Sequence, residues 1–244
     1  MLRLILAVLF LIIFFIWSIP ALIVEWIIGK FNQNAKDMSS LRIVQFAFKV
    51  LRFIGGIKTT VIGYDRIPKD EPVLFVGNHK SYFDVVISYS MMPGRTGFVA
   101  KKEIEKVPLL RSWMRNLYCL FLDRKNIKEG LKTTLKGIDY IKQGISIVIF
   151  PEGTRNTFQD GMLPFHEGSL KFAEKSGCKI IPMVQNNTGE CFEKHLPWIK
   201  KTHTVIEFCE PIDIKNLTKE EKKFLGAHVQ SIIEQKYQEN KKYI

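Results

Sequence analysis

Residues 77–84, with the sequence GNHKSYFD, place His79 five positions before Asp84 and directly after the apolar run VLFV. The two side chains can meet if His79 lies in a loop and Asp84 lies in the first turn of the helix that follows. The N-terminus of that helix would favour an ionised Asp84 and oppose a charged imidazole. The pair therefore suits a neutral histidine base whose tautomer is fixed by a carboxylate, although a histidine at a strand end can also be purely structural.

Two other chemistries fit these residues less well. A Ser-His-Asp hydrolase could use Ser81 or Ser169, but the chain has no G-x-S-x-G elbow, and Ser81 follows His79 too closely to approach it from a separate loop. A metal site is disfavoured because the five histidines show no H-x-x-x-H or H-x-H spacing and Asp84 alone is a poor second ligand. We therefore predict no metal, and a proton taken from a hydroxyl that the substrate supplies.

Two more polar blocks follow apolar runs that predict strands, at 117–122 and 145–150. The first block contains Arg124, and the second, PEGTRN, contains Arg155. In a parallel sheet the carboxyl ends of the strands meet at one rim, where ligands collect. We therefore expect both blocks to lie beside His79.

Cations on this rim would hold an acidic group. Guanidinium groups bind phosphate oxygens through paired hydrogen bonds, and Lys101 and Lys102 lie at another predicted strand-to-helix junction. Each cation alone is best explained as a solvated surface residue. Only their clustering beside His79 predicts an acidic substrate.

The block PEGTRN also contains residues that suit a ligand-binding turn. Gly153 allows a ligand to approach the backbone, and Thr154 can cap a helix or bind phosphate. A plain tight turn is the alternative, and it would leave Glu152 unexplained.

The elements that must position these residues alternate between strand and helix. From residue 59 onward, short apolar runs are separated by segments with helical periodicity. This pattern predicts an α/β fold with a mostly parallel (mixed) central sheet flanked by helices. The segment 217–244 mixes Lys and Glu with apolar residues and is most simply a solvated terminal helix.

The N-terminal segment is suited to lipid. Residues 4–24 include no charged side chain, and at about 1.5 Å of rise per residue they match the thickness of a bilayer core. A cleaved signal peptide is disfavoured because no small-x-small site is present and apolar residues continue to Ile28. Pro20 bends or ends a helix, so a straight span and a half-inserted, re-entrant anchor both remain open.

After a polar break at 31–40, apolar residues recur at helical spacing with cations between them. These apolar residues are Leu41, Val44, Phe48 and Leu51. The pattern predicts an interfacial amphipathic helix whose cations reach lipid phosphates, and a core helix packed on the following domain is the alternative. The chain would thus begin with a membrane-associated helical pair.

Composition narrows the class of protein and its partners. The chain has 244 residues, 46% of them hydrophobic, which is enough for a full core. Its formal net charge of +12 suits an anionic membrane surface, an acidic substrate or nucleic acid. Nucleic acid is disfavoured because the cations are spread along the chain without a recognisable binding motif.

Two features indicate the side of the membrane on which the rest of the chain lies. The four cysteines show no C-x-x-C pair, which is typical of reduced thiols in a protein that faces the cytosol. Six of the seven Lys and Arg within residues 1–58 follow the apolar run. The positive-inside rule then puts the C-terminal domain at the cytoplasmic face, of the inner membrane if the cell is bacterial.

Taken in order, these blocks resemble the motifs of the 1-acylglycerol-3-phosphate acyltransferases, the lysophosphatidic acid acyltransferase family. The motif N-H-x-x-x-x-D matches Asn78, His79 and Asp84, and F-x-x-R matches Phe121 to Arg124. The motif F-P-E-G-T-R-S matches residues 150–156, with Asn156 in the last place, and an apolar-Pro-apolar step matches residues 181–183. The four motifs occur in the family's order and cover residues 72–185.

The resemblance implies transfer of a fatty acyl group from a thioester to the 2-hydroxyl of 1-acylglycerol 3-phosphate, giving phosphatidic acid. It implies that His79 is the general base and Asp84 its orienting carboxylate. It implies no cofactor, because acyl-CoA or acylated acyl carrier protein is a co-substrate. An acyltransferase domain at 59–244 would follow membrane-anchoring helices at 1–58. The implied ligands of the glycerol phosphate are Arg124, Glu152, Gly153, Thr154 and Arg155.

One position departs from the family, because the Lys of its F-K-x-G segment is replaced by His166. The head group therefore stays open, and another lysophospholipid, glycerol 3-phosphate or a different membrane-borne alcohol are alternative acceptors. A non-catalytic basic membrane-binding module is the alternative from another class. For an enzyme, we expect direct attack without an acyl-enzyme, with backbone donors or Lys101 stabilising the oxyanion.

Overall fold

The apolar runs of the sequence assemble into one sheet in the computed structural model, which describes residues 1–157 and 161–244. Within those residues the strand order is β1-β7-β6-β2-β5-β3-β4, and every neighbouring pair is parallel except β6 with β7. The predicted mixed, mostly parallel sheet is confirmed. The strands are β1 (Ile57–Ile62), β2 (Val73–Gly77), β3 (Thr96–Lys101), β4 (Leu120–Leu122), β5 (Ser146–Ile149), β6 (Lys179–Asn186) and β7 (Thr202–Phe208).

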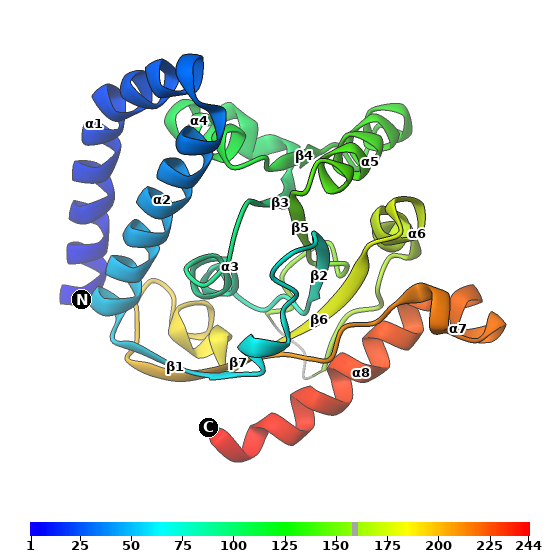
Figure 1. Ribbon diagram of the computed structural model, residues 1–244. Coiled ribbons are helices and arrows are strands. Elements are labelled where there is room, and N and C mark those ends of the chain that lie inside the picture. The colour runs from blue at the N-terminus through cyan, green and yellow to red at the C-terminus, as the bar shows by residue number, and fades with distance from the viewer. Residues whose placement is uncertain (158–160) are drawn as a thin grey trace.

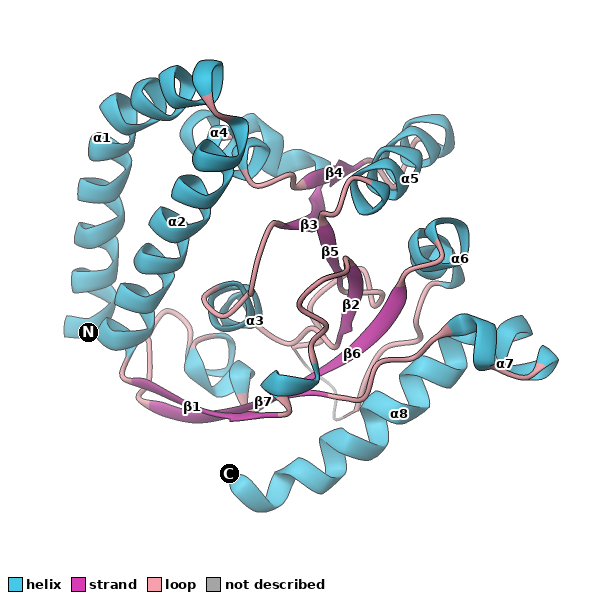
Figure 2. Cartoon of the chain, in the orientation of Figure 1, coloured by secondary structure: helices cyan, strands magenta, loops and turns pink. Residues whose placement is uncertain are grey.

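Helices cover both faces of this sheet (Figure 1). Helices α2, α3 and α4 contribute to the core on one face, and α5, α6 and α8 to the core on the other. Figure 2 shows the strands between these two helical layers. The helices are α1 (Leu2–Phe31), α2 (Gln33–Gly55), α3 (Tyr82–Tyr89), α4 (Pro108–Asn116), α5 (Ile127–Lys142), α6 (Lys171–Ser176), α7 (Lys219–Lys223) and α8 (Leu225–Glu239).

The central strand β2 leads directly into the segment that carries His79. Val73 and Phe75 belong to the core beneath α3, whereas Leu74 and Val76 belong to the opposite core. All four are at most 1% exposed, as expected for a central parallel strand that is buried on both faces. His79 therefore follows the most deeply packed part of the sheet.

Strand β4 is shorter than the run predicted at 117–122. It begins only at Leu120, because Tyr118 has a φ of +58° and so interrupts the extended backbone. Arg124 still follows the end of this strand, as predicted.

The N-terminal helices α1 and α2 lie side by side as an antiparallel pair at one end of the molecule (Figure 1). The polar segment 31–40 is almost entirely helical, because only Asn32 separates the helices, and its side chain caps α2. Two of its polar residues contact α1. Ser39 and Ser40 donate hydrogen bonds of 2.6 and 3.0 Å to the carboxylate of buried Glu25.

Helix α2 has two apolar faces with different surroundings. Leu41 and Val44 are 3% and 8% exposed and pack in the core with α3. For this face the core-helix alternative is correct and the interfacial prediction is wrong. Phe46 and Phe53, on the other hand, are 63% and 86% exposed.

Helix α1 continues without a break through Pro20. Among the helices of the described residues, it alone has the length and apolar composition needed to cross a membrane. Midway along, Ser18 accepts a 2.8 Å hydrogen bond from the indole of Trp113 on α4, and the ring of Phe14 lies 6.1 Å from that indole. The middle of α1 is therefore fixed to the part of the protein that contains the sheet.

The C-terminal segment is not the solvated helix predicted for 217–244. In α8, Leu225, Val229 and Ile233 are at most 1% exposed and pack in the core on the side of β6. Their spacing of four residues puts all three on one face of the helix. The prediction failed because the many charged residues of this segment occupy the remaining surface and mask the apolar stripe.

This packing makes a test possible. We expect Ile233→Ala to lower the free energy of unfolding by about 3 kcal/mol, because it removes buried methylenes and leaves a cavity. Ile127→Ala is the control, since Ile127 is 88% exposed, and should change the value by less than about 0.5 kcal/mol. Chemical denaturation of the purified proteins in detergent measures both, and equal effects would contradict the burial of α8.

Candidate active site

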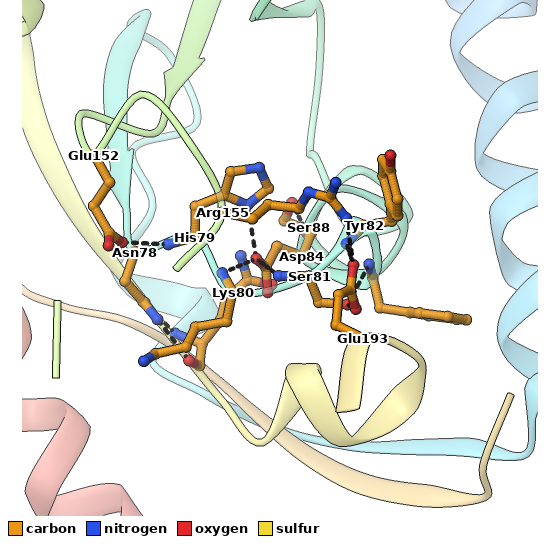
Figure 3. A network of polar contacts seen from close by, with 12 residues as sticks. Asn78, His79, Lys80, Ser81, Tyr82, Asp84, Ser88, Glu152, Arg155 and Glu193 are labelled. Carbon is orange, nitrogen blue, oxygen red and sulfur yellow. Dashed lines mark hydrogen bonds and ion pairs between the residues drawn. The ribbon is translucent and has the colours of Figure 1, made fainter. Parts of the chain in front are cut away.

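His79 and Asp84 meet where β2 gives way to α3. Ser81 caps α3 and Asp84 lies in its first turn, so the loop and the helix turn toward each other as the spacing predicts. The Nδ1 atom of His79 lies 2.8 Å from Oδ2 of Asp84 (Figure 3). The structure thus brings the two predicted catalytic residues into direct contact.

The carboxylate of Asp84 is held by the backbone of the same turn. Its side chain is fully buried, and Oδ2 also accepts the backbone N–H groups of Lys80 at 2.6 Å and Ser81 at 2.7 Å. Because a carboxylate oxygen only accepts hydrogen bonds, Nδ1 of His79 must be the donor in its contact with Oδ2 of Asp84. Neutral His79 therefore carries its proton on Nδ1 and has its lone pair on Nε2.

The imidazole ring is fixed by stacking as well as by Asp84. It lies 4.3 Å from the ring of Phe150, with an interplanar angle of 13°. The side chain of His79 is 17% exposed, so a substrate can reach part of the ring. Two contacts thus define the orientation of the base before any substrate binds.

Glu152 supports the His79 segment from the end of β5. One carboxylate oxygen accepts the N–H of His79 at 2.7 Å, and the other accepts the N–H of Leu163 at 2.8 Å. Burial raises the pKa of Glu152, although these two hydrogen bonds act in the opposite direction. Both oxygens of Glu152 therefore bind backbone N–H groups, and its role in binding the glycerol phosphate stays a prediction.

Two asparagines connect this segment to its neighbours. The amide of Asn78 donates to the carbonyl and accepts from the N–H of Gln185 on β6, both at 2.8 Å. The N–H of Asn156 donates to the carbonyl of His79 at 2.8 Å. The blocks after β2 and β5 therefore form one continuous rim, as the rule for parallel sheets predicts.

Arg124 reaches the same rim from the end of β4, where its guanidinium donates a hydrogen bond to the carbonyl of Gly153. Gly153 has a φ of +70°, which a side chain disfavours. A Cβ at Gly153 would lie 3.2 Å from the ring of His166 and 3.3 Å from Nη1 of Arg124, so both side chains lie against this glycine. Burial lowers the pKa of Arg124, but a guanidinium stays charged at physiological pH.

Arg155 is held by two groups, of which the sequence indicated neither. Its Nη1 lies 2.8 Å from a carboxylate oxygen of Glu193, and its guanidinium lies 3.6 Å from the centre of the Tyr82 ring. Glu193 belongs to no motif and lies 38 positions from Arg155 in the sequence, so only the folded chain reveals this contact. The side chain of Arg155 is 30% exposed, and part of its guanidinium is open to a ligand.

Three other predicted cationic or polar residues are not brought into this network. Lys101 is exposed at the end of β3, where it pairs with Leu122 of β4, and its side chain makes no hydrogen bond or ion pair with the described residues. Lys102 pairs with Glu105 at 2.8 Å, and Thr154 is exposed. The oxyanion role of Lys101 and the phosphate role of Thr154 remain predictions.

The contacts of Ser81 disfavour a Ser-His-Asp hydrolase. Ser81 is fully buried, and its hydroxyl donates to Glu193 at 2.5 Å and accepts the N–H of Phe83 at 3.0 Å. It is therefore occupied as a helix cap. The hydroxyl that His79 can deprotonate is then one that a substrate brings.

The charge of the buried Asp84 carboxylate can be tested by substitution. In Asp84→Asn the amide oxygen can still accept the three hydrogen bonds of Oδ2, but the charge that stabilises a protonated imidazole is lost. We expect kcat to fall by about 10²- to 10⁴-fold, the range of general-base contributions, with the fold retained. Steady-state kinetics and circular dichroism check this, and a kcat within twofold of the unmodified protein would contradict a catalytic role for the charge of Asp84.

Comparison with known proteins agrees with this site. The family model described as Acyltransferase matches residues 58–186, which include every motif on the rim. The chain is 32% identical to a 1-acyl-sn-glycerol-3-phosphate acyltransferase of Haemophilus influenzae, over 84% of each chain. It is 29% identical to the enzyme of the same name from Borreliella burgdorferi, over 81% of this chain and 78% of that one.

The fold also matches a solved structure. The crystal structure of PlsC, the 1-acyl-sn-glycerophosphate (LPA) acyltransferase of Thermotoga maritima, superposes with a TM-score of 0.79 over 97% of this chain and 96% of that chain, at 22% identity. The similarity therefore includes the N-terminal helical pair. Together with the family match, these relatives show that the chain belongs to the acyltransferase family, among the 1-acyl-sn-glycerol-3-phosphate acyltransferases.

Proposed function

We propose that the protein transfers a fatty acyl group from acyl-CoA or acylated acyl carrier protein to the 2-hydroxyl of 1-acylglycerol 3-phosphate, giving phosphatidic acid. The observation that carries this proposal is the His79–Asp84 pair on a rim shared with two arginines. A general base acts on a hydroxyl group of the substrate, and arginine side chains bind an anionic group. A lysophospholipid phosphate supplies both in one molecule, and the names of the relatives agree with it.

The tautomer of His79 determines which of its ring nitrogens can act as the base. Nε2 takes the proton of the 2-hydroxyl as that oxygen attacks the thioester carbonyl. The new ester C–O bond forms, the C–S bond breaks, and the proton passes from His79 to the departing thiolate. A positioned base contributes about 10²- to 10⁴-fold, or roughly 3 to 5 kcal/mol of barrier, and the positioning of both substrates must supply the remainder.

The phosphate of the acceptor would lie between Arg124 and Arg155. Gly153 leaves room beside Arg124 because it has no Cβ. His166 packs against the same glycine, in the place where the family motif has Lys. The protein therefore has one fixed positive charge fewer at this edge, which suits weaker electrostatic binding of the phosphate rather than a different reaction.

The helical pair is suited to the surface of a membrane. Leu9, Ile13 and Ile16 of α1 are more than half exposed, and so are Phe46 and Phe53 of α2. Exposed apolar side chains in this number mark a contact with lipid. The lysolipid would then enter the site from the membrane in which it is dissolved.

The contact between α1 and α4 favours a half-inserted pair over a straight span. Trp113 touches the middle of α1, and its helix also carries Arg115, whose guanidinium pairs with Glu105 at 2.7 Å and whose side chain is 59% exposed. A full span would draw this ion pair toward the hydrocarbon, where both charges would lose their contact with water. We therefore place the pair in one leaflet, and the cations that follow α1 indicate the cytoplasmic leaflet.

Purified enzyme tests the proposal directly. With lysophosphatidic acid and each thioester in turn, we expect phosphatidic acid by mass spectrometry, and His79→Ala should reduce its formation by at least about 10²-fold without loss of the fold. Glycerol 3-phosphate and other lysophospholipids serve as competing acceptors. Product from another acceptor alone would replace the proposed substrate, and full activity of His79→Ala would exclude the proposed base.

A further inference from the structure

Glu193 lies outside every motif but contacts three groups at the rim. It belongs to the short turn Glu193–His195 that follows β6, and its side chain is 3% exposed. One oxygen accepts the hydroxyl of Ser81 at 2.5 Å, and the other accepts the N–H of Tyr82 at 2.8 Å and the guanidinium of Arg155 at 2.8 Å. Figure 3 shows Glu193 between Arg155 and the start of α3.

Glu193 and Tyr82 restrict the side-chain rotamers of Arg155. A solvated arginine samples many rotamers and must lose that freedom when it binds a phosphate. Here the ring of Tyr82 covers one face of the guanidinium at 3.6 Å, and Glu193 holds one edge. The plane of the guanidinium is therefore fixed in advance, and its remaining N–H groups keep one direction.

Glu193 also contacts the start of α3, the helix whose first turn contains Asp84. Glu193 binds Ser81, which caps α3 and whose own N–H donates to Oδ2 of Asp84 at 2.7 Å. The same carboxylate thus contacts both the arginine and the turn that holds the carboxylate of the dyad. A shift of Glu193 would move one relative to the other.

We infer that Glu193 is a positioning residue that sets the distance and angle between Arg155 and the His79–Asp84 pair, and so between the phosphate of the acceptor and its reacting hydroxyl. This inference depends on the proposed function, because it takes Arg155 as a ligand of the phosphate. Glu193 itself touches no reacting atom. It also repels a second anion, so the phosphate binds the free edge of Arg155 rather than replacing Glu193.

The neighbouring Glu190 provides a matched control. It lies on the preceding turn and pairs with Lys194 at 2.7 Å and His195 at 2.9 Å, and among the described residues its side chain makes no hydrogen bond or ion pair with Arg155 or α3. Glu190→Gln therefore removes an equal charge nearby. We expect it to leave both Michaelis constants and kcat unchanged within twofold.

Glu193→Gln should act on one substrate only. The glutamine oxygen can still accept the N–H of Tyr82, and its NH2 group can donate to the hydroxyl of Ser81, but the charge that orients Arg155 is lost. We expect the KM for lysophosphatidic acid to rise by about tenfold, the effect of one charge-assisted hydrogen bond, with the KM for the thioester unchanged and kcat within about twofold. Glu193→Ala, which also removes the contacts to α3, should in addition lower kcat by at least about tenfold.

A double-mutant cycle separates positioning from general destabilisation. In an Arg155→Ala background, Glu193→Gln should have no further effect on the KM for lysophosphatidic acid. Arginine side-chain NMR gives a readout that does not need turnover: the guanidinium signals of Arg155 should show slow rotation in the unmodified protein and rapid averaging in Glu193→Gln.

The outcomes distinguish this inference from the proposed function. Unchanged Arg155 signals in Glu193→Gln, or additive effects of the two substitutions, would overturn the role of Glu193 while acyl transfer stands. Equal increases in the KM values of both substrates would also overturn it. Absence of acyl transfer in the unmodified protein, with the Arg155 signals altered as expected, would overturn the proposed function and retain the structural coupling.

Discussion

The hydrogen bond between Nδ1 of His79 and the buried carboxylate of Asp84 is the interaction on which the rest of the site depends. It fixes the tautomer, and the tautomer decides which nitrogen can accept a proton. The surrounding structure fixes the positions of the two side chains that form this hydrogen bond. Strand β2 is buried on both faces, the cap of α3 directs two N–H groups at Asp84, and Glu152 holds the N–H of His79.

The charged residues at the rim form two groups, the buried carboxylates and the partly exposed arginines. The buried carboxylates of Asp84, Glu152 and Glu193 accept hydrogen bonds from the protein itself, whereas Arg124 and Arg155 keep part of their guanidinium groups open. Acidic residues in a site for an anionic substrate would be unfavourable if they faced the ligand. Because they face the backbone and Arg155, they organise the site without strong repulsion of the phosphate proposed to bind there.

The sequence was sufficient to predict the sheet, the contact of His79 with Asp84 and the meeting of the blocks at one rim, because these depend on local spacing and on the parallel arrangement of strands. It was insufficient where the contact is distant or the surface is shared. The backbone partners of Glu152 cannot be seen in the sequence, and Glu193 belongs to no motif. The faces of α2 and α8 were misjudged because hydrophobic periodicity does not say whether lipid or the core covers an apolar stripe.

The tautomer of His79 is the most direct test of the account. Two-bond ¹H–¹⁵N correlation spectra of ¹⁵N-histidine-labelled protein, assigned with His79→Ala, distinguish the two neutral forms. The account predicts a neutral imidazole with its proton on Nδ1 and an unprotonated Nε2 at the pH of maximal activity. A ring protonated on Nε2 would contradict it, since that nitrogen could not accept a proton from a substrate hydroxyl.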